Sequence, residues 1–292
     1  MAFAANSVLC RLALGDHTID AATFTLVRLA SGIVVLLLIL LIKTKVNGQN
    51  LQAQKALPKG SWSASMLLFV YALCFSFAYT SLATGTGALI LFAAVQITMI
   101  LRTVFSGHKL HLVEWLGLLL AFCGFVYLML PKITTPSLFG FILMTIAGIA
   151  WGFYTINGRN SVNALADTTY NFLRTLPLLL LVLLFNYTHA HYTPMGVLLA
   201  FLSGAIASGI GYTLWYIALS GLTTIQAAVV QLLVPVIAAL GGLVLISEVI
   251  KQRFVLSSVM ILGGILLVML VGYDKKRRQK QVIDKRKDSL PL

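Results

Sequence analysis

Apolar stretches of about twenty residues, separated by short polar segments, run through almost the whole sequence. An α-helix needs about this length to cross the hydrocarbon core of a bilayer, which is about 30 Å thick. The chain of 292 residues is 59% hydrophobic and only 10% charged, and its mean hydropathy is +0.95, which excludes a water-soluble domain. The sequence therefore predicts an all-α integral membrane protein.

Ten transmembrane helices are expected. Complete spans are predicted at 24–42, 61–82, 85–104, 112–130, 138–157, 168–186, 195–219, 223–246 and 254–272. The first apolar piece, 1–14, is too short to cross a bilayer, and it has neither the basic start nor the small-residue cleavage site of a signal peptide. We expect this piece to be a shortened or truncated first span.

The basic residues are unevenly distributed along the chain. Eight of the 21 Lys and Arg residues lie between 275 and 287, directly after the last expected span. A basic tail in this position is typical of a cytoplasmic anchor facing anionic lipid, so we expect no nucleic-acid partner despite the net charge of +13. Because cytoplasmic loops carry the excess of Lys and Arg, we place the tail and the loop at 43–60 on the cytoplasmic side of a bacterial-type inner membrane.

No signature of a cofactor, metal or catalytic site stands out in the sequence. Cys10, Cys74 and Cys123 fall in apolar runs without metal-ligand spacing, as small hydrophobic residues at helix interfaces do. His189 and His191 lack further ligands nearby, and there is no glycine-rich phosphate loop with a lysine. We therefore expect no cofactor, no metal, no enzymatic activity and no ATP-driven transport.

The second half of the sequence repeats the order of features of the first half. A shift of 140 residues pairs Ala88 with Ala228, and Gly124 with Gly264. Each half is expected to hold five helices, an odd number, so the second half must cross the membrane in the opposite sense. Such inverted repeats are characteristic of secondary transporters, whose site lies near the midplane between the halves. We expect a first five-helix repeat at 1–133, a second, inverted repeat at 134–273 and a disordered basic tail at 274–292.

Four segments carry a further signal: Phe3-Ala-Ala-Asn6-Ser-Val-Leu-Cys-Arg11-Leu-Ala-Leu, Phe24-Thr-Leu-Val-Arg28-Leu-Ala-Ser-Gly32, Trp151-Gly-Phe-Tyr154, and Pro235 followed by Ser247-Glu248. The chain resembles the EamA-type, ten-helix branch of the drug/metabolite transporter superfamily. The likeness covers nearly the whole chain and implies a transporter, although substrates across the family are diverse. In that family a Pro in the second half precedes a Glu that opens the last hairpin, and Pro235 and Glu248 match this spacing. The first half departs from the pattern, with Val95 and His108 at the equivalent places.

Two arginines within the expected spans are candidates for binding an anionic group. Charged side chains inside membranes usually face the bundle interior or a wet cavity, and a guanidinium matches carboxylate and phosphate bidentately. Arg28 and Arg174 lie a similar distance into their spans from opposite sides, so each is a candidate for one mouth of a central pathway. The alternative interpretation is snorkelling towards the interface or a role in helix capping.

No acidic residue lies in the middle of an expected span: Asp16, Asp20, Glu114, Asp167 and Glu248 lie at span ends or in loops, and the other three lie in the tail. Proton-coupled export of cationic drugs commonly uses a buried carboxylate that alternately binds proton and substrate. This distribution favours a facilitator, an exchanger, or a carrier of neutral, zwitterionic or anionic solutes over a cationic multidrug antiporter.

Aromatic and amide residues inside the spans are the remaining candidates for lining a pocket. The main candidates are Tyr79, Gln96, Trp151, Tyr154, Tyr212 and Trp215, with Asn6, Asn157, Tyr216, Gln226 and Gln231 behind them. Helical spacing places Trp151 with Tyr154, and Tyr212 with Trp215, on single helix faces. The alternative is an interfacial aromatic belt and interhelical hydrogen bonding. Structural or hinge roles are expected for Pro177, Pro235 and Glu248.

These observations favour a secondary transporter that works by alternating access between two inverted halves. We expect it to export or exchange small polar metabolites such as amino acids, as a monomer or a homodimer in the lipid bilayer. A lipid-phosphate or sugar-phosphate carrier is the alternative within transport, because of the arginines. A membrane-embedded transferase or assembly factor is the alternative from another class.

Overall fold

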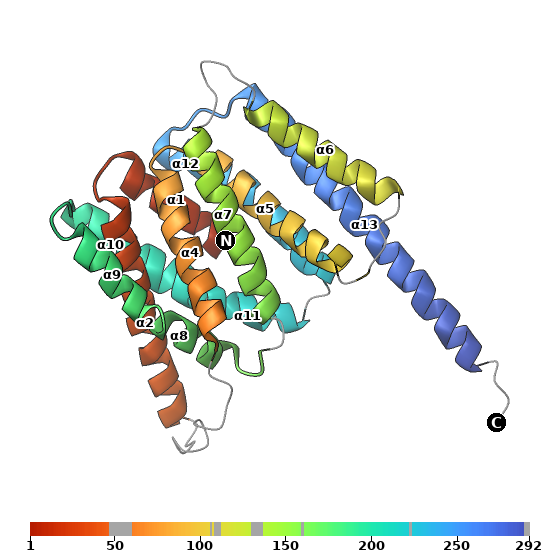
Figure 1. The fold of residues 1–292 in the computed structure, drawn as a ribbon, viewed down its shortest axis with the longest axis horizontal. Helices are drawn as coiled ribbons and strands as arrows, with labels where there is room; N and C mark the ends of the chain where they lie inside the picture. Colours follow the sequence, from red (N-terminus) through yellow and green to blue (C-terminus); the bar gives the residue numbers. More distant parts are fainter. Residues whose placement is uncertain are drawn as a thin grey trace.

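The computed structural model describes residues 1–46, 60–105, 107, 112–129, 137–158, 161–221 and 224–288. The first half of the chain forms α1 (Ala2–Gly15), α2 (Ala21–Val46), α4 (Trp62–Tyr79), α5 (Thr84–Phe105) and α6 (Leu112–Met129) (Figure 1). The second half forms α7 (Leu138–Gly158), α8 (Ala164–Leu173), α9 (Leu176–Asn186), α10 (Pro194–Leu202), the π-helix η1 (Ser203–Ile210), α11 (Gly211–Gly221), α12 (Thr224–Ile246) and α13 (Gln252–Asp288).

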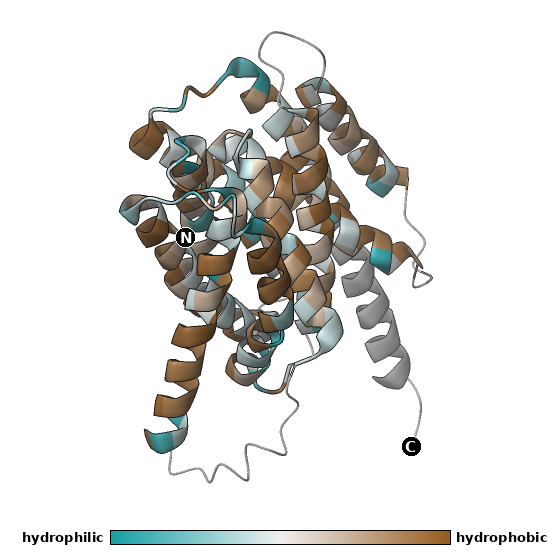
Figure 2. Cartoon of the chain, turned by 60° about the vertical axis from the view of Figure 1, so that its left-hand side comes forward, coloured by the Kyte–Doolittle hydropathy of each residue, from teal (hydrophilic) through white to brown (hydrophobic). Residues whose placement is uncertain are grey.

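The expected all-helical membrane fold is confirmed. Six helical stretches within the described residues are long and apolar enough to cross a bilayer: Ala21–Val46, Trp62–Tyr79, Thr84–Arg102, Leu138–Gly158, Ala164–Asn186 and Pro194–Leu219. Four shorter apolar helices lie where the first, fifth, ninth and tenth spans are expected. Large apolar side chains such as Leu119, Phe185 and Val244 are exposed on the outside of the bundle, as contact with lipid requires. Figure 2 shows hydrophilic residues gathered at the helix ends.

Two of the expected spans are interrupted. The seventh, 168–186, is divided into α8 and α9, because Pro177 has no N–H to donate to the carbonyl of Leu173, the last residue of α8. The eighth, 195–219, changes from α-helix to π-helix over η1. The expected disordered tail also differs, since α13 continues through residue 274 and ends at Asp288. Its Lys, Arg and Gln residues are good helix formers that extend a helix already begun.

The helices pack in pairs around a buried centre. Helix α7 packs against α4 and α5, α5 packs against α12, and η1 packs against α2 (Figure 1). Helices α6 and α13 form a pair at one side of the bundle, and α13 projects beyond it (Figure 1). Residues 130–136, where the boundary between the halves was expected, lie outside the described residues.

Asp20 lies at one end of the bundle and Asp167 at the other, so these are the Asp20 end and the Asp167 end. At the Asp20 end, helices α1, α4, α9 and α12 finish, and the chain turns back into the bundle. At the Asp167 end, helices α2, α7 and α11 finish. Side-chain caps start the helices that leave these ends, since Ser61, Asn163 and Thr193 each accept the backbone N–H of the third residue of α4, α8 and α10, respectively.

Glycines bring α6 and α13 into close contact. A Cβ atom on Gly117 would lie 2.6 Å from the carbonyl oxygen of Gly264, and one on Gly264 would lie 2.8 Å from the backbone nitrogen of Ala121. Backbone atoms cannot move aside as the end of a flexible side chain can. The crossing therefore needs small residues on both helices, as close helix packing in lipid commonly does.

We predict that Gly264→Ala destabilises the protein although it adds only one methyl group. The methyl group would push α13 away from α6, at a cost of about 1–3 kcal/mol. Gly263→Ala is the matched control, because a Cβ atom there meets nothing within 4 Å. Thermal unfolding in detergent should show a lower melting temperature for Gly264→Ala only. Equal melting temperatures for both variants would contradict this packing.

Candidate functional site

Arg28 lies inside the bundle, two turns into α2, and only 1% of its surface is exposed. Its Nε donates to Ser208 Oγ at 3.1 Å, and its Nη2 donates to the hydroxyls of Tyr71 at 3.1 Å and Tyr212 at 2.8 Å. The guanidinium carbon lies 5.2 Å from the ring centre of Tyr71 and 4.9 Å from that of Phe75. The side chain is therefore held by hydroxyl groups and aromatic faces, and the snorkelling interpretation is wrong for this residue.

The charge of Arg28 has no counter-charge in the part of the chain that the structure describes. No carboxylate lies within hydrogen-bonding or ion-pair distance of it, and its Nη1 atom is buried without a hydrogen-bond partner. An uncompensated buried charge costs several kcal/mol. An anionic oxygen placed on Nη1 would supply both the missing acceptor and the missing charge.

The π-helix η1 brings the second half of the chain against Arg28. A side chain at Gly204 would collide with the carbonyl of Arg28 and the hydroxyl of Ser31, so only glycine allows η1 to approach α2 this closely. This close approach places the Ser208 hydroxyl within hydrogen-bonding distance of Arg28 Nε. Short π-helical segments occur frequently at functional sites.

Aromatic rings from α4, α7 and α11 surround the hydroxyl groups that hold Arg28. The Trp151 ring centre lies 4.5 Å from that of Tyr212 and 4.9 Å from that of Tyr71. Tyr154 stacks on Trp151 at 5.3 Å. The two pairs that helical spacing placed on single faces, Trp151 with Tyr154 on α7 and Tyr212 with Trp215 on α11, thus meet in one cluster with Arg28.

Phe3 completes this cluster from the start of α1. Its ring centre lies 5.5 Å from that of Trp215, 5.7 Å from that of Trp151 and 5.9 Å from that of Tyr212. The indole N–H groups of Trp151 and Trp215 are buried without hydrogen-bond partners. Together with Arg28 Nη1, the cluster contains three buried donors that the described residues leave unsatisfied.

Other predicted pocket residues have partners elsewhere in the bundle. Gln96 Nε2 donates to Gln231 Oε1 at 3.1 Å and joins α5 to α12. Tyr79 is fully buried towards the Asp20 end, where its hydroxyl donates to the carbonyl of Thr84 at 3.2 Å. The side chain of Gln226 lies outside the described residues. A direct contact of Gln96 or Tyr79 with a solute stays a prediction.

Arg174 differs from Arg28 in its surroundings. It is the C-cap residue of α8, and its guanidinium lies 5.8 Å from the ring centre of Trp62, which is exposed at the first turn of α4. This position suits the capping and interfacial interpretation. The structure therefore does not place the two arginines as equivalent mouths of one pathway, because Arg28 lies in the centre and Arg174 at the Asp167 end.

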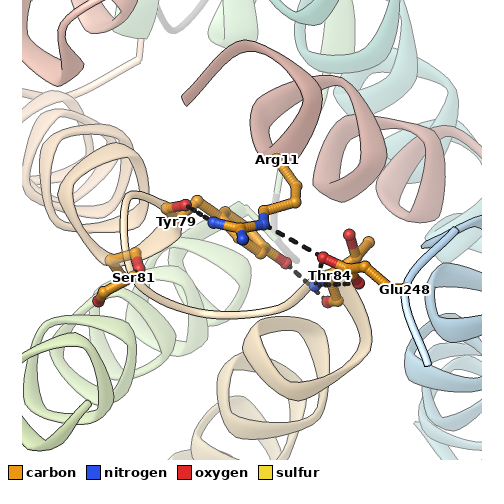
Figure 3. Close-up of polar contacts among 6 residues, drawn as sticks. Arg11, Tyr79, Ser81, Thr84 and Glu248 are labelled. Carbon is orange, nitrogen blue, oxygen red and sulfur yellow. Dashed lines mark hydrogen bonds and ion pairs between the residues drawn. The ribbon is translucent and has the colours of Figure 1, made fainter. Parts of the chain in front are cut away.

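Glu248 joins three segments at the Asp20 end (Figure 3). Its carboxylate accepts from Arg11 Nε at 3.1 Å and from the Thr84 backbone N–H at 2.8 Å, the first residue of α5. Arg11 also donates to the carbonyl of Tyr79 at 3.1 Å. Ser247, with a φ of 56°, turns the chain after α12 so that Glu248 points back into the bundle. This network ties the last hairpin of the second half to α1, α4 and α5. His108, its counterpart in the sequence repeat, lies outside the described residues.

Pro235 lies inside α12, which continues without a break from Thr224 to Ile246. The proline removes one backbone hydrogen bond but does not divide this helix, in contrast to Pro177 between α8 and α9. A hinge role for either residue stays a prediction.

Sequence reasoning missed Tyr71 and Phe3 as members of the cluster. Tyr71, Phe75 and Tyr79 recur at steps of four residues, which places them on one face of α4, and this spacing could have identified Tyr71. Phe3 gave no such signal, because it lies in the short first span.

Comparisons with known proteins agree with this arrangement. The model of the EamA-like transporter family matches residues 1–130 and again residues 138–270. An uncharacterized protein of Pseudomonas aeruginosa is 45% identical over 280 residues, covering 96% of this chain and 94% of its own. The uncharacterized transporter YoaV of Bacillus subtilis is 21% identical, covering 87% of this chain and 89% of its own. A crystal structure with 16% identity superposes with a TM-score of 0.59 over 92% of this chain and 96% of its own, a likeness that shows the fold alone.

We predict that the Arg11–Glu248 ion pair stabilises the folded protein. Both side chains are mostly buried, with 25% and 17% exposed, and coupled neighbours of this kind show interaction energies of about 0.5–3 kcal/mol. Arg11→Gln and Glu248→Gln, alone and combined, form a double-mutant cycle that thermal unfolding in detergent can measure. Asp16→Asn is the control, because Asp16 is an exposed acid at the same end. Additive losses in the double variant would contradict the pairing.

Proposed function

Because the chain belongs to the EamA-like transporter family of the drug/metabolite transporter superfamily, we propose that it is a secondary transporter that exports or exchanges small carboxylate-bearing metabolites such as amino acids. The observation that carries the choice of solute is the buried guanidinium of Arg28. Its Nη1 atom lacks an acceptor, and the described residues around it supply hydroxyls and aromatic rings but no carboxylate.

A solute carboxylate would bind Nη1 of Arg28, whose other nitrogens are occupied by Ser208, Tyr71 and Tyr212. The aromatic cluster would pack against the apolar part of the solute, and the indole N–H of Trp151 could donate to a second oxygen. An ammonium group would lie over aromatic faces, where cations bind favourably. A zwitterionic amino acid therefore suits the cluster better than a dianion.

Alternating access is supported by how the two halves pack. In chain order, α1 corresponds to α7, α4 to the stretch that contains η1, α5 to α12 and α6 to α13. The α4–α7 contact therefore corresponds to the α1–η1 contact, and α5–α7 corresponds to α1–α12. All four of these contacts occur. The α5–α12 and α6–α13 pairs each join two corresponding helices, so exchanging the halves leaves these pairs unchanged. The two separate family matches agree with this division. Two halves of opposite sense, with a site between them, are the arrangement that rocking transporters use.

The excess of Lys and Arg supports placing the Asp167 end and the C-terminus in the cytoplasm of an inner membrane. With no carboxylate among the described partners of Arg28, solute gradients or exchange would drive transport rather than a proton bound at this cluster. The cluster is complete within one chain, so the proposal requires no second subunit.

The alternatives have less support. A lipid-phosphate or sugar-phosphate carrier would be favoured by two arginines facing one site, whereas Arg174 lies beside Trp62 at the Asp167 end. A membrane-embedded transferase or assembly factor is disfavoured by the family, whose members are transporters.

The proposal is tested by counterflow in proteoliposomes with a panel of labelled amino acids, monocarboxylates and sugar phosphates, with and without a pH gradient. We expect exchange of one or more amino acids that does not require the pH gradient. Exchange of phosphorylated solutes alone would contradict the choice of substrate. Turnover of a lipid substrate without flux of any solute would contradict transport itself.

We predict that Arg28→Gln lowers counterflow of the transported solute by about tenfold or more, because a hydrogen bond to a charged group is lost. Tyr212→Phe should have a smaller effect, since it removes one partner of Arg28 and leaves the charge. Arg174→Gln is the matched control and should keep flux close to that of the wild-type protein. A greater loss in Arg174→Gln than in Arg28→Gln would reverse the assignment of the site.

A further inference from the structure

At each end of the bundle, an aspartate of one half binds the backbone of the other half. At the Asp20 end, Asp20 Oδ2 accepts from the N–H of His191 at 2.9 Å. At the Asp167 end, Asp167 Oδ1 accepts from the N–H of Gly60 at 3.0 Å. His191 lies just before α10, and Gly60 lies just before α4. Helices α4 and α10 occupy corresponding places in the two halves. The two contacts are therefore equivalent, except that the half that supplies the aspartate and the half that supplies the N–H are exchanged.

The Asp20 contact is one of a short set of hydrogen bonds that join the α1–α2 connection to the α9–α10 connection. Asp20 N donates to the His191 carbonyl at 2.9 Å, and Thr193 N donates to the Thr18 carbonyl at 2.8 Å. Asp20 Oδ1 also caps α2 by accepting from Thr23 N, and it accepts from the side chain of Asn186 at 3.0 Å. Burial disfavours the charged carboxylate, but the hydrogen bonds from Thr23, His191 and Asn186 outweigh it and lower the pKa of Asp20.

The Asp167 contact is similarly supported by neighbouring groups. The N–H of Ser61 donates to Asn171 Oδ1 at 2.9 Å, one turn along α8 from Asp167, and Ser161 donates to the second carboxylate oxygen of Asp167. Gly60 has a φ of +59°, and a Cβ atom there would collide with Asn171 Oδ1. Glycine is therefore required for the N–H of residue 60 to reach Asp167.

We propose that Asp20 and Asp167 are a matched pair of gate residues, one holding each end of the pathway closed, and that transport requires the two contacts to open in turn. This inference rests on the alternating-access transport proposed above. With both contacts formed and Arg28 buried between them, the structure corresponds to the occluded step of the cycle. Each gate is formed by side chain and backbone across the two halves, so rocking of one half against the other breaks one contact and preserves the second.

Cys10 provides a reporter for the opening of either end. It lies on α1 and is fully buried where α1 meets η1, with its Sγ 3.8 Å from Ser203 Oγ. Cys74 and Cys123 are replaced by alanine, so that Cys10 is the sole thiol in the chain. A charged, membrane-impermeant methanethiosulfonate reagent is then applied to inside-out and right-side-out vesicles.

We predict opposite sidedness for the two variants. Asparagine keeps one accepting oxygen and turns the other into a donor, so Asp20→Asn should speed labelling of Cys10 from the Asp20 end by about tenfold or more. Asp167→Asn should do the same from the Asp167 end. Gly60→Ala, which leaves Asp167 intact, should match Asp167→Asn. Asp16→Asn is the control for loss of an acid and should leave both labelling rates unchanged.

Faster labelling from the same side in both variants, equal acceleration from both sides, or no change in either variant would each overturn the assignment. Elution as a single species in size-exclusion chromatography confirms that each variant folds. Solute flux is measured in the same vesicles. Side-specific labelling without flux in the wild-type protein would refute transport and leave the gates standing, whereas normal flux with unchanged labelling would refute the gates and leave transport standing.

Discussion

The burial of one guanidinium between the two halves determines how the centre of this protein is built. Arg28 cannot reach water, so its charge must be satisfied from within the bundle. Tyr71 from α4 and Tyr212 from α11 supply hydroxyls, and Ser208 supplies another from the π-helix. Because these groups come from both halves, any relative movement of the halves changes the environment of the charge. The carboxylate of the proposed solute would compensate for that change.

Close backbone contact makes this arrangement possible. Gly204 lets η1 lie directly on α2, and five of the other seven residues of η1 are also Gly, Ala or Ser, which leaves room for close packing. In lipid, helices gain little from burying apolar side chains against one another, so close packing and interhelical hydrogen bonds hold them together. The result is a centre where aromatic rings fill space and hydroxyls carry the polar contacts, while the outer helices need only present apolar surface.

Much of this fold could be predicted from the sequence, because span length and hydrophobicity are local properties. Trp151 with Tyr154 and Tyr212 with Trp215 were identified for the same reason, since helical spacing fixes which residues share a face. The contrast between Arg28 and Arg174 could not be predicted, because both occupy similar depths and only tertiary packing buries one of them. The π-helix gave no compositional signal, and the partners of Glu248 lie far away in the sequence.

The two aspartates bind backbone N–H groups rather than side chains, and this affects which loop residues are free to change. Every amino acid except proline carries a backbone N–H, so residue 191 can be replaced widely without removing the donor to Asp20. Residue 60 is restricted to glycine by its positive φ and by the nearby Asn171 oxygen. Homologues that keep this geometry would therefore vary in the loop at one end of the bundle and retain a single glycine at the other.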